Sequence, residues 1–166
     1  MAGHERSATD GGDPVRVRPG DISAVDAVAE LWVRLATDQR AYGSHLLAEP
    51  NRQLARDAAA QHAVTGGLLV ARDDDEVVGF VTFSKEQGDY DVDSRRGLVH
   101  DLFVDEQYRG RGVGGRLLAA AEDRLAADDV THVSLEAMAG NTDARRFYER
   151  NGYEVFRVEM EKEIRD

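Results

Sequence analysis

Apolar and polar residues alternate in several short stretches of this chain, a period typical of strands with one buried face. The acidic turn Asp73-Asp74-Asp75 separates two of these stretches, so we expect their strands to pair as an antiparallel hairpin. The predicted strands cover residues 15–18, 68–71, 77–83, 98–104, 133–135 and 153–160.

Apolar residues also recur at helical spacing between these strands. This spacing predicts helices over residues 25–35, 51–63, 117–125 and 142–150. Pro19-Gly20-Asp21 marks the approach to the first helix, and Asn151-Gly152 marks the end of the last. We expect the first two helices to cover one face of a sheet.

With 166 residues the chain fits one domain with one active site. Residues 1–13 are rich in Gly, Asp and Ser without apolar periodicity, and we interpret them as a mobile tail before a single domain over residues 14–166. No apolar run approaches the roughly 20 residues that cross a bilayer, and the start lacks the order of a secretory signal. We therefore expect a cytoplasmic protein that does not bind membranes.

The chain contains no cysteine, which excludes disulfides, thiolate metal sites and a cysteine nucleophile. His4, His45, His62 and His132 show no metal-ligand spacing, so we interpret them as ordinary residues and predict no metal.

The formal net charge of −11 repels phosphate backbones, so general nucleic-acid binding is not expected. Lys85 and Lys162 are the only lysines, and this arginine-rich, acidic composition resembles that of proteins from salt-loving archaea. The acidity has two interpretations, which are attraction of a cationic substrate and solvation of the surface in strong brine.

Residues 108–118, YRGRGVGGRLL, place several glycines directly before an apolar helix. Glycines let backbone N–H groups approach a phosphate closely, and a helix N-terminus adds about half a positive charge. Arg109 and Arg111 add full charges. The pattern predicts a phosphate-binding loop.

Two nucleotide sites compete for this loop. A Walker-type loop needs lysine and then serine or threonine where Arg116-Leu117 stands, which argues against ATP or GTP hydrolysis. Gly110, Gly112 and Gly115 match the dinucleotide fingerprint, and Glu136 lies where its ribose-binding acid would be. The chain is short for the second half of that fold, so this dinucleotide site is the less favoured alternative.

A third interpretation comes from two motifs. Residues 109–114, RGRGVG, are similar to the Q/R-x-x-G-x-G/A motif of the GCN5-related N-acetyltransferase (GNAT) superfamily. Residues 141–153, NTDARRFYERNGY, resemble the N-x-x-A-x-x-F-Y-x-x-x-G-F/Y segment of the same family. The resemblance implies an α/β fold with a mixed, mostly antiparallel sheet of six or seven strands and about four flanking helices. It also implies an enzyme that moves an acetyl group from acetyl-CoA directly to a primary amine.

In this family the strand over residues 98–104 would splay from the strand over residues 133–135. The resemblance implies that main-chain groups of Leu102, Phe103 and Val104 bind the pantetheine arm of acetyl-CoA. The pyrophosphate would lie on the glycine loop, formed by Arg109, Gly110, Arg111, Gly112, Val113, Gly114 and Gly115. Asn141 matches a residue that bonds the cofactor arm, and it is also a residue type that caps helices.

Two side chains are candidates for proton transfer. Tyr148 matches the family tyrosine that often protonates the departing thiolate, although a core aromatic beside Phe147 is the alternative. His100 stands where polyamine acetyltransferases of the superfamily place a glutamate; it is either a general base or an ordinary histidine. Asp101 points away from His100 on a regular strand, and a bulge would change this.

The acceptor is less defined. The acidic loop over residues 86–93 suits a small amine, a polyamine, an aminoglycoside or a protein N-terminus, but it is equally typical of a solvated loop. Tyr42 and His45 follow the first helix and are candidates to line the acceptor pocket. A non-catalytic acyl-CoA sensor is the alternative to an enzyme, and homodimers are frequent among domains of this kind.

Overall fold

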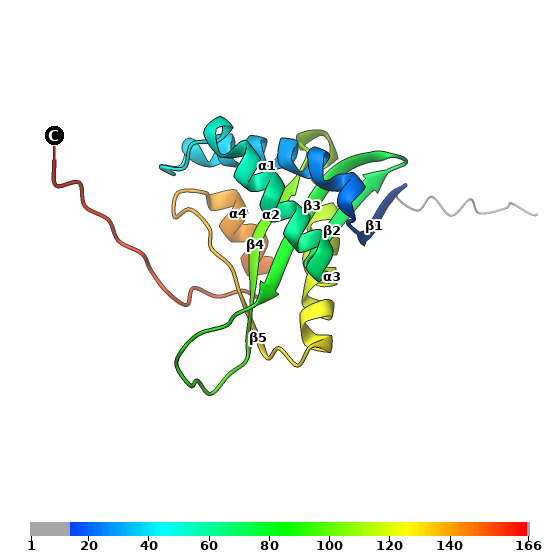
Figure 1. Cartoon of the computed structure of the whole chain (residues 1–166). Coiled ribbons are helices and arrows are strands. Elements are labelled where there is room, and N and C mark those ends of the chain that lie inside the picture. The colour runs from blue at the N-terminus through cyan, green and yellow to red at the C-terminus, as the bar shows by residue number, and fades with distance from the viewer. Residues whose placement is uncertain (1–13, 166) are drawn as a thin grey trace, which may run out of the picture.

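The computed structural model describes residues 14–165, so the predicted mobile tail over residues 1–13 lies outside the described residues. A central sheet carries helices on both sides (Figure 1). The strands are β1 (Val15–Pro19), β2 (Leu68–Asp73), β3 (Glu76–Lys85), β4 (Arg96–Val104) and β5 (His132–Ser134). The helices are α1 (Val25–Arg40), α2 (Arg52–Thr65), α3 (Val113–Ala127) and α4 (Thr142–Arg150), with short 3-10 turns at Ile22–Ala24, Glu49–Asn51 and Glu106–Tyr108.

The sheet has the strand order β1-β2-β3-β4-β5. The first four strands pair antiparallel in sequence, and β5 alone joins in parallel, beside β4. The predicted mixed, mostly antiparallel α/β fold is therefore confirmed, but the expected six or seven strands are five in the described chain.

The sheet separates two apolar clusters. On one face, α1 and α2 cover Val70, Phe80 and Phe103. On the other face, Leu117 and Leu118 of α3 pack against the sheet. The hydrophobic cluster on the α3 face is also contacted by Phe147, Tyr148 and Tyr153, which bring the C-terminal half of the chain against β4.

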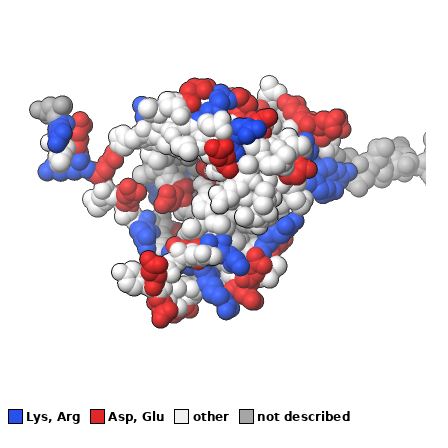
Figure 2. Space-filling model, viewed as in Figure 1, with Lys and Arg blue, Asp and Glu red and all other residues white. Residues whose placement is uncertain are grey.

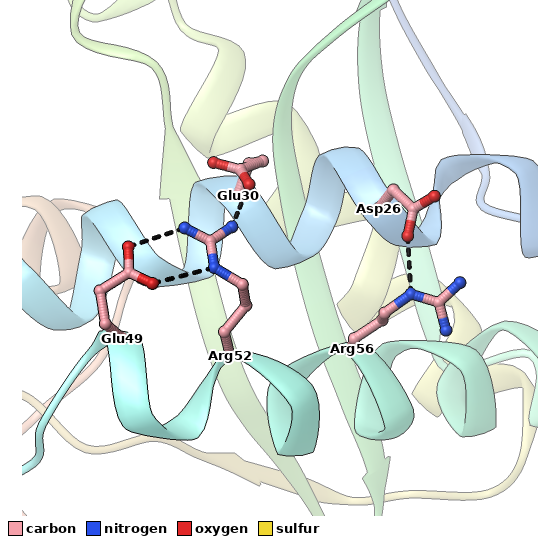
Figure 3. Close-up of polar contacts among 5 residues, drawn as sticks. All are labelled: Asp26, Glu30, Glu49, Arg52 and Arg56. Carbon is pink, nitrogen blue, oxygen red and sulfur yellow. Dashed lines mark hydrogen bonds and ion pairs between the residues drawn. The ribbon is translucent and has the colours of Figure 1, made fainter.

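Ion pairs hold α2 along α1 (Figure 3). Arg52 contacts Glu30 of α1 and binds Glu49 at 2.7 Å, and Arg56 binds Asp26 of α1 at 2.7 Å. All of these side chains are substantially exposed, so solvent screens the pairs and they contribute little to stability. The pairs join α1 and α2 at two places along their length.

The predicted strand over residues 153–160 is wrong for this chain. After Gly152 the segment carries no assigned strand, and it extends away from the body (Figure 1). Its sequence does alternate, but alternation makes a strand only where a neighbouring strand pairs with it. No described strand of the chain pairs with this segment.

Acidic and basic side chains interleave over the face seen in Figure 2. No described helix is long and apolar enough to cross a membrane.

Candidate active site

Strands β4 and β5 pair along only part of their length. The parallel ladder joins Arg96, Gly97 and Leu98 to β5. From Val99 onward β4 pairs only with β3, up to Val104. The two strands therefore diverge, and the edge of β4 facing β5 is left open beyond Leu98. Leu102, Phe103 and Val104, the predicted cofactor-arm residues, all lie in this open part.

The glycine loop enters α3 through two left-handed residues. Gly110 has φ +74° and Gly112 has φ +78°, a conformation that residues with a Cβ adopt at a cost. Gly112 is the N-cap of α3 and provides no side-chain hydrogen bond. The N–H groups of the first turn, from Val113 to Gly115, have no helical partner, so they are available to an anion.

The arginines of this loop are engaged with the protein. The Nε of Arg109 donates to the carbonyl oxygen of Val104 at 2.9 Å, and its guanidinium lies 3.6 Å from Asp38 of α1 and 5.1 Å from the centre of the Phe103 ring. Arg111 stacks over Tyr108 at 5.0 Å. Arg109 therefore ties the loop to α1 and β4. The backbone N–H groups of the loop are then the donors that are best placed to bind an anion.

A bulge in β4 changes which way its polar side chains point. Thr82 pairs with Asp101 and Phe83 pairs with Val99, so His100 is an extra residue on this strand. The Thr82 hydroxyl lies 3.5 Å from the Asp101 carboxylate, and Ser84 lies 2.6 Å from the His100 ring. Because Thr82 and Ser84 are two positions apart on β3, His100 and Asp101 share one face of the sheet. The expectation that Asp101 points away from His100 is therefore wrong.

His100 is exposed and belongs to a small polar cluster. Its Nε2 lies 2.6 Å from the Ser84 Oγ, and its ring centre lies 5.3 Å from that of His62 on α2. Burial and the neighbouring His100 lower the pKa of His62, so His62 stays neutral at neutral pH. The ordinary role expected for His62 therefore needs revision, because this side chain flanks the candidate base.

Asp101 and Tyr148 are both largely buried and close enough to interact electrostatically. Burial raises the pKa of Asp101 despite the nearby His100 and the hydrogen bond from Thr82. Burial also raises the pKa of Tyr148, and the Asp101 charge raises it further. Tyr148 packs against Phe147 and Tyr153, with ring centres 5.3 and 6.0 Å away. Its hydroxyl is therefore kept protonated well above neutral pH.

Asn141 caps α4, and its side chain accepts a hydrogen bond from the Ala144 amide at 3.1 Å. The expected capping role is confirmed, while contact with a cofactor arm stays a prediction. Tyr42 lies close to the preceding Gly140, where an added Cβ would stand 3.9 Å from the ring. His45 instead lies 3.1 Å from Glu161 of the C-terminal segment.

A cavity of about 160 Å³ lies between α1 and the turn after β4. It is lined by Arg34, Thr37, Asp38, Phe103, Glu106 and Arg109. This volume is below the roughly 300 Å³ of small-ligand pockets, so it does not hold a coenzyme by itself. Arg34 closes one side through an ion pair of 2.9 Å with Asp105.

Thr82, Ser84 and His62 are site residues that the sequence did not reveal. They come from β3 and α2, and nothing in the local pattern of α2 separates His62 from an ordinary residue. The useful signal was the polar pair Thr82-x-Ser84 on an otherwise apolar strand.

The sheet contradicts the dinucleotide alternative. That fold binds its ligand at the carboxyl ends of parallel strands, whereas only β4 and β5 are parallel here. Within residues 14–165 no group of three or more metal-ligating side chains is placed to hold an ion.

Comparison with known proteins gives matches over most of the chain. Residues 27–153 match the model of the acetyltransferase (GNAT) family. The uncharacterized N-acetyltransferase YhfO of Bacillus subtilis is 37% identical over 92 residues, which are 52% of this chain and 58% of that protein. A mycothiol acetyltransferase of Brachybacterium faecium is 35% identical over 130 residues, which are 76% of this chain and 38% of that protein. The chain thus spans well under two thirds of these relatives.

Solved structures share the fold. A single-residue mutant of the BH1408 protein of Bacillus halodurans superposes with a TM-score of 0.79 at 18% identity, covering 90% of this chain and 99% of that one. The PaiA N-acetyltransferase of Thermoplasma acidophilum, solved in complex with coenzyme A, has a TM-score of 0.70 at 16% identity and covers 87% of this chain and 92% of that one.

Proposed function

Because this chain belongs to the acetyltransferase (GNAT) family, we propose that it transfers an acetyl group from acetyl-CoA directly to a primary amine. The observation that carries the proposal is the divergence of β4 from β5, with the amino end of α3 beyond one end of the open edge. Tyr148 is close enough to Asp101 of β4 for the carboxylate charge to raise its pKa. Residues 14–166 would act as one acyl-CoA-binding domain.

The residues present fit acetyl-CoA. An anionic pyrophosphate suits the uncapped first turn of α3, whose N–H groups and dipole favour negative charge. The open edge of β4 over Leu102 and Phe103 offers main-chain groups to an amide-containing arm, whereas the Val104 carbonyl is taken by Arg109. Asn141 would bond the same arm with the hydrogen-bonding capacity that capping leaves free.

The thioester of acetyl-CoA supplies an activated acetyl group. The chain's residues then move two protons. His100 takes the proton that the amine loses, directly or through water, and the Ser84 contact orients its ring. Tyr148 gives its proton to the departing thiolate. Because burial and Asp101 raise its pKa, Tyr148 holds that proton until a strongly basic group forms beside it.

The first experiment is calorimetric titration with acetyl-CoA and, separately, with NAD, in molar KCl so that the acidic surface is screened. We expect acetyl-CoA to bind and NAD not to bind. Binding of NAD alone would contradict the proposal.

The second experiment measures free thiol released from acetyl-CoA with a panel of amines, comprising a small amine, a polyamine, an aminoglycoside and a peptide with a free N-terminus. Release that depends on one amine supports acetyl transfer and identifies the acceptor class. Binding without release under every condition would point to the acyl-CoA sensor instead.

We also propose that the acidic composition serves salt adaptation in a cytoplasmic protein of halophilic origin. The interleaving of charges in Figure 2 supports this, because a surface built to attract one cationic substrate would concentrate its acidic residues near the site. An acceptor whose KM rises steeply with salt would favour substrate attraction.

A further inference from the structure

His62 and His100 come from different elements, and their rings lie side by side. The ring centres are 5.3 Å apart and the ring planes are tilted by 42°. His62 lies on α2 and is partly buried, whereas His100 lies in the bulge of β4 and is exposed. In the proposed acetyl transfer only His100 takes part, and the second imidazole beside it has no assigned role.

Strand β3 holds each of the two rings from a neighbouring position. The ring of His62 forms a hydrogen bond with the main chain of Phe83. Because the Phe83 amide already donates to the Gly67 carbonyl at 2.9 Å, the ring of His62 donates to the Phe83 carbonyl. The next residue, Ser84, has its hydroxyl 2.6 Å from Nε2 of His100. Two consecutive residues of β3 therefore anchor the two rings.

The end of α2 leaves the His62 ring little freedom. Gly66 caps the helix, and the Gly67 amide donates to the His62 carbonyl at 2.8 Å. A Cβ at Gly67 would lie 2.3 Å from the Phe83 carbonyl oxygen and 3.0 Å from Nδ1 of His62. Only glycine leaves this room, and Nδ1 is the ring nitrogen on the side of the carbonyl. In the neutral ring, donation from Nδ1 leaves the lone pair on Nε2.

We propose that His62 is a positioning residue for His100, a role that rests on the proposed acetyl transfer. The His62 ring occupies one side of the His100 ring, and the Ser84 hydroxyl accepts a hydrogen bond from Nε2 of His100. His100 is thereby held in one tautomer, with its lone pair on Nδ1. When the acceptor amine loses its proton, an N–H bond of the amine breaks and one forms at a nitrogen whose place is already fixed.

The charges around the pair favour a single proton on His100. Burial and the neighbouring His100 lower the pKa of His62, so His62 stays neutral when His100 becomes charged. Asp101 of β4 interacts electrostatically with His100, and Tyr148 of α4 interacts with Asp101. Strand β3 presents the uncharged Ser84 hydroxyl. A proton taken from the amine therefore stays on His100 and does not pass to His62.

Closing the end of α2 is the alternative role for His62. A contact with the Phe83 carbonyl needs only a hydrogen-bond donor close to the Cβ, which asparagine also supplies. Positioning of His100 needs the part of the ring that lies beyond Nδ1. His62→Asn therefore removes the positioning and keeps the contact with β3, whereas His62→Phe restores a ring beside His100.

Nitrogen NMR of the histidine rings tests the positioning without any substrate, at a pH where both rings are neutral. The His100 nitrogens should show mainly the tautomer with hydrogen on Nε2 in the parent protein and a mixture of tautomers in His62→Asn. His62→Phe should restore the single tautomer. His132→Asn, which changes an exposed histidine of β5, is the matched control and should leave the His100 signals unchanged. Circular dichroism melting shows whether each variant is folded.

Steady-state kinetics tests the link to proton removal, with the amine that the thiol-release panel identifies. His62→Asn should lower kcat by up to roughly 100-fold at neutral pH, because misplacing a reacting group costs on that order. The KM for acetyl-CoA should not change. The loss should shrink as the pH rises, because a larger share of the amine is then unprotonated and needs no base. In a His100→Ala background, His62→Asn should have little further effect.

Three results would each overturn the positioning role. These are the same His100 tautomers in the parent protein and in His62→Asn, a loss of kcat that is equal at every pH, and additive losses in the double variant. If the parent protein acetylates none of the amines, the proposed acetyl transfer fails. The tautomer measurement needs neither acetyl-CoA nor an acceptor, so it still decides whether His62 positions His100.

Discussion

Tyr148, the proposed proton donor, lies in surroundings that hold its proton. It lies on α4 with its ring among aromatic neighbours, and the charge of Asp101 on β4 acts on its hydroxyl. Burial acts first and the carboxylate second, and both raise the pKa of the phenol. In the proposed reaction the departing thiolate takes that proton.

We expect Tyr148→Phe to lower turnover by about 10²–10⁴-fold, because general acid catalysis contributes on that order. The affinity for acetyl-CoA should not change, because the ring and its packing remain. Tyr153→Phe is the control, since its hydroxyl binds Glu122. Steady-state kinetics and calorimetry measure the two effects, and unchanged turnover in Tyr148→Phe would remove this residue from the mechanism.

A second prediction concerns pH and stability. The folded protein raises the pKa of Asp101 above its ordinary value of 3.8, so the folded state binds this proton more tightly than the unfolded state. Asp101 therefore lowers stability as pH rises from 3.8 through its folded pKa. Asp101→Asn should be more stable than the parent at neutral pH, and the difference should vanish below pH 3.8. Urea unfolding at the two pH values measures it; a less stable variant at neutral pH would contradict the prediction.

Some of the site could be predicted from residue types and some could not. The glycines, Asn141 and Tyr148 belong to motifs that can be recognised in the sequence. The neighbours of His100 come from β3 and α2, which are distant from it in the sequence. The bulge that places His100 and Asp101 on one face depends on a register shift against Thr82 and Phe83. A one-residue shift of this kind leaves no mark on the periodicity of a short apolar strand.

At the scale of elements, the junction between the glycine loop and α3 carries the cofactor end of the proposed site. We expect Gly112→Ala to destabilise the protein by about 1–2 kcal/mol, because its φ of +78° is costly for a residue with a Cβ. Gly115→Ala is the matched comparison inside the helix, where the nearest atom would be 3.9 Å away and alanine should gain up to about 1 kcal/mol. Chemical unfolding measures the change in the free energy of unfolding for each variant. Equal effects would show that the left-handed turn is not required.

Elements with strong periodicity were predicted well, and those that depend on a partner were not. The strands over residues 68–71 and 77–83 pair as the acidic turn indicates, although β3 runs two residues farther. The segment over residues 153–160 has an equally clear alternation, but no strand among the described residues pairs with it. A strand is a property of a pair, so the sequence of one member does not decide whether it forms.

For the whole molecule, the net charge of −11 predicts that salt stabilises the fold. Raising KCl from 0.1 M to 1 M shortens the screening length from about 10 Å to about 3 Å, which removes most of the self-repulsion. The exposed pairs between α1 and α2 lose little stabilisation, because solvent already screens them. The melting temperature should therefore rise with KCl. Asp91→Lys, in the exposed loop after β3, should make the increase of the melting temperature with KCl smaller. A melting temperature that does not depend on salt would contradict this prediction.

The short ladder between β4 and β5 also means that some parts of the molecule are less stable against local opening than others. β5 is joined to β4 by three residue pairs, and no residue of α4 is fully buried. By contrast, β2 and β3 are buried along most of their length. The amides of α4 should therefore exchange with deuterated water by local opening, long before those of β2. A molecule that bridges α3 and α4 would suppress this local opening. Bound acetyl-CoA should therefore slow amide exchange most in the region of β5 and α4, which is the least stable region without it.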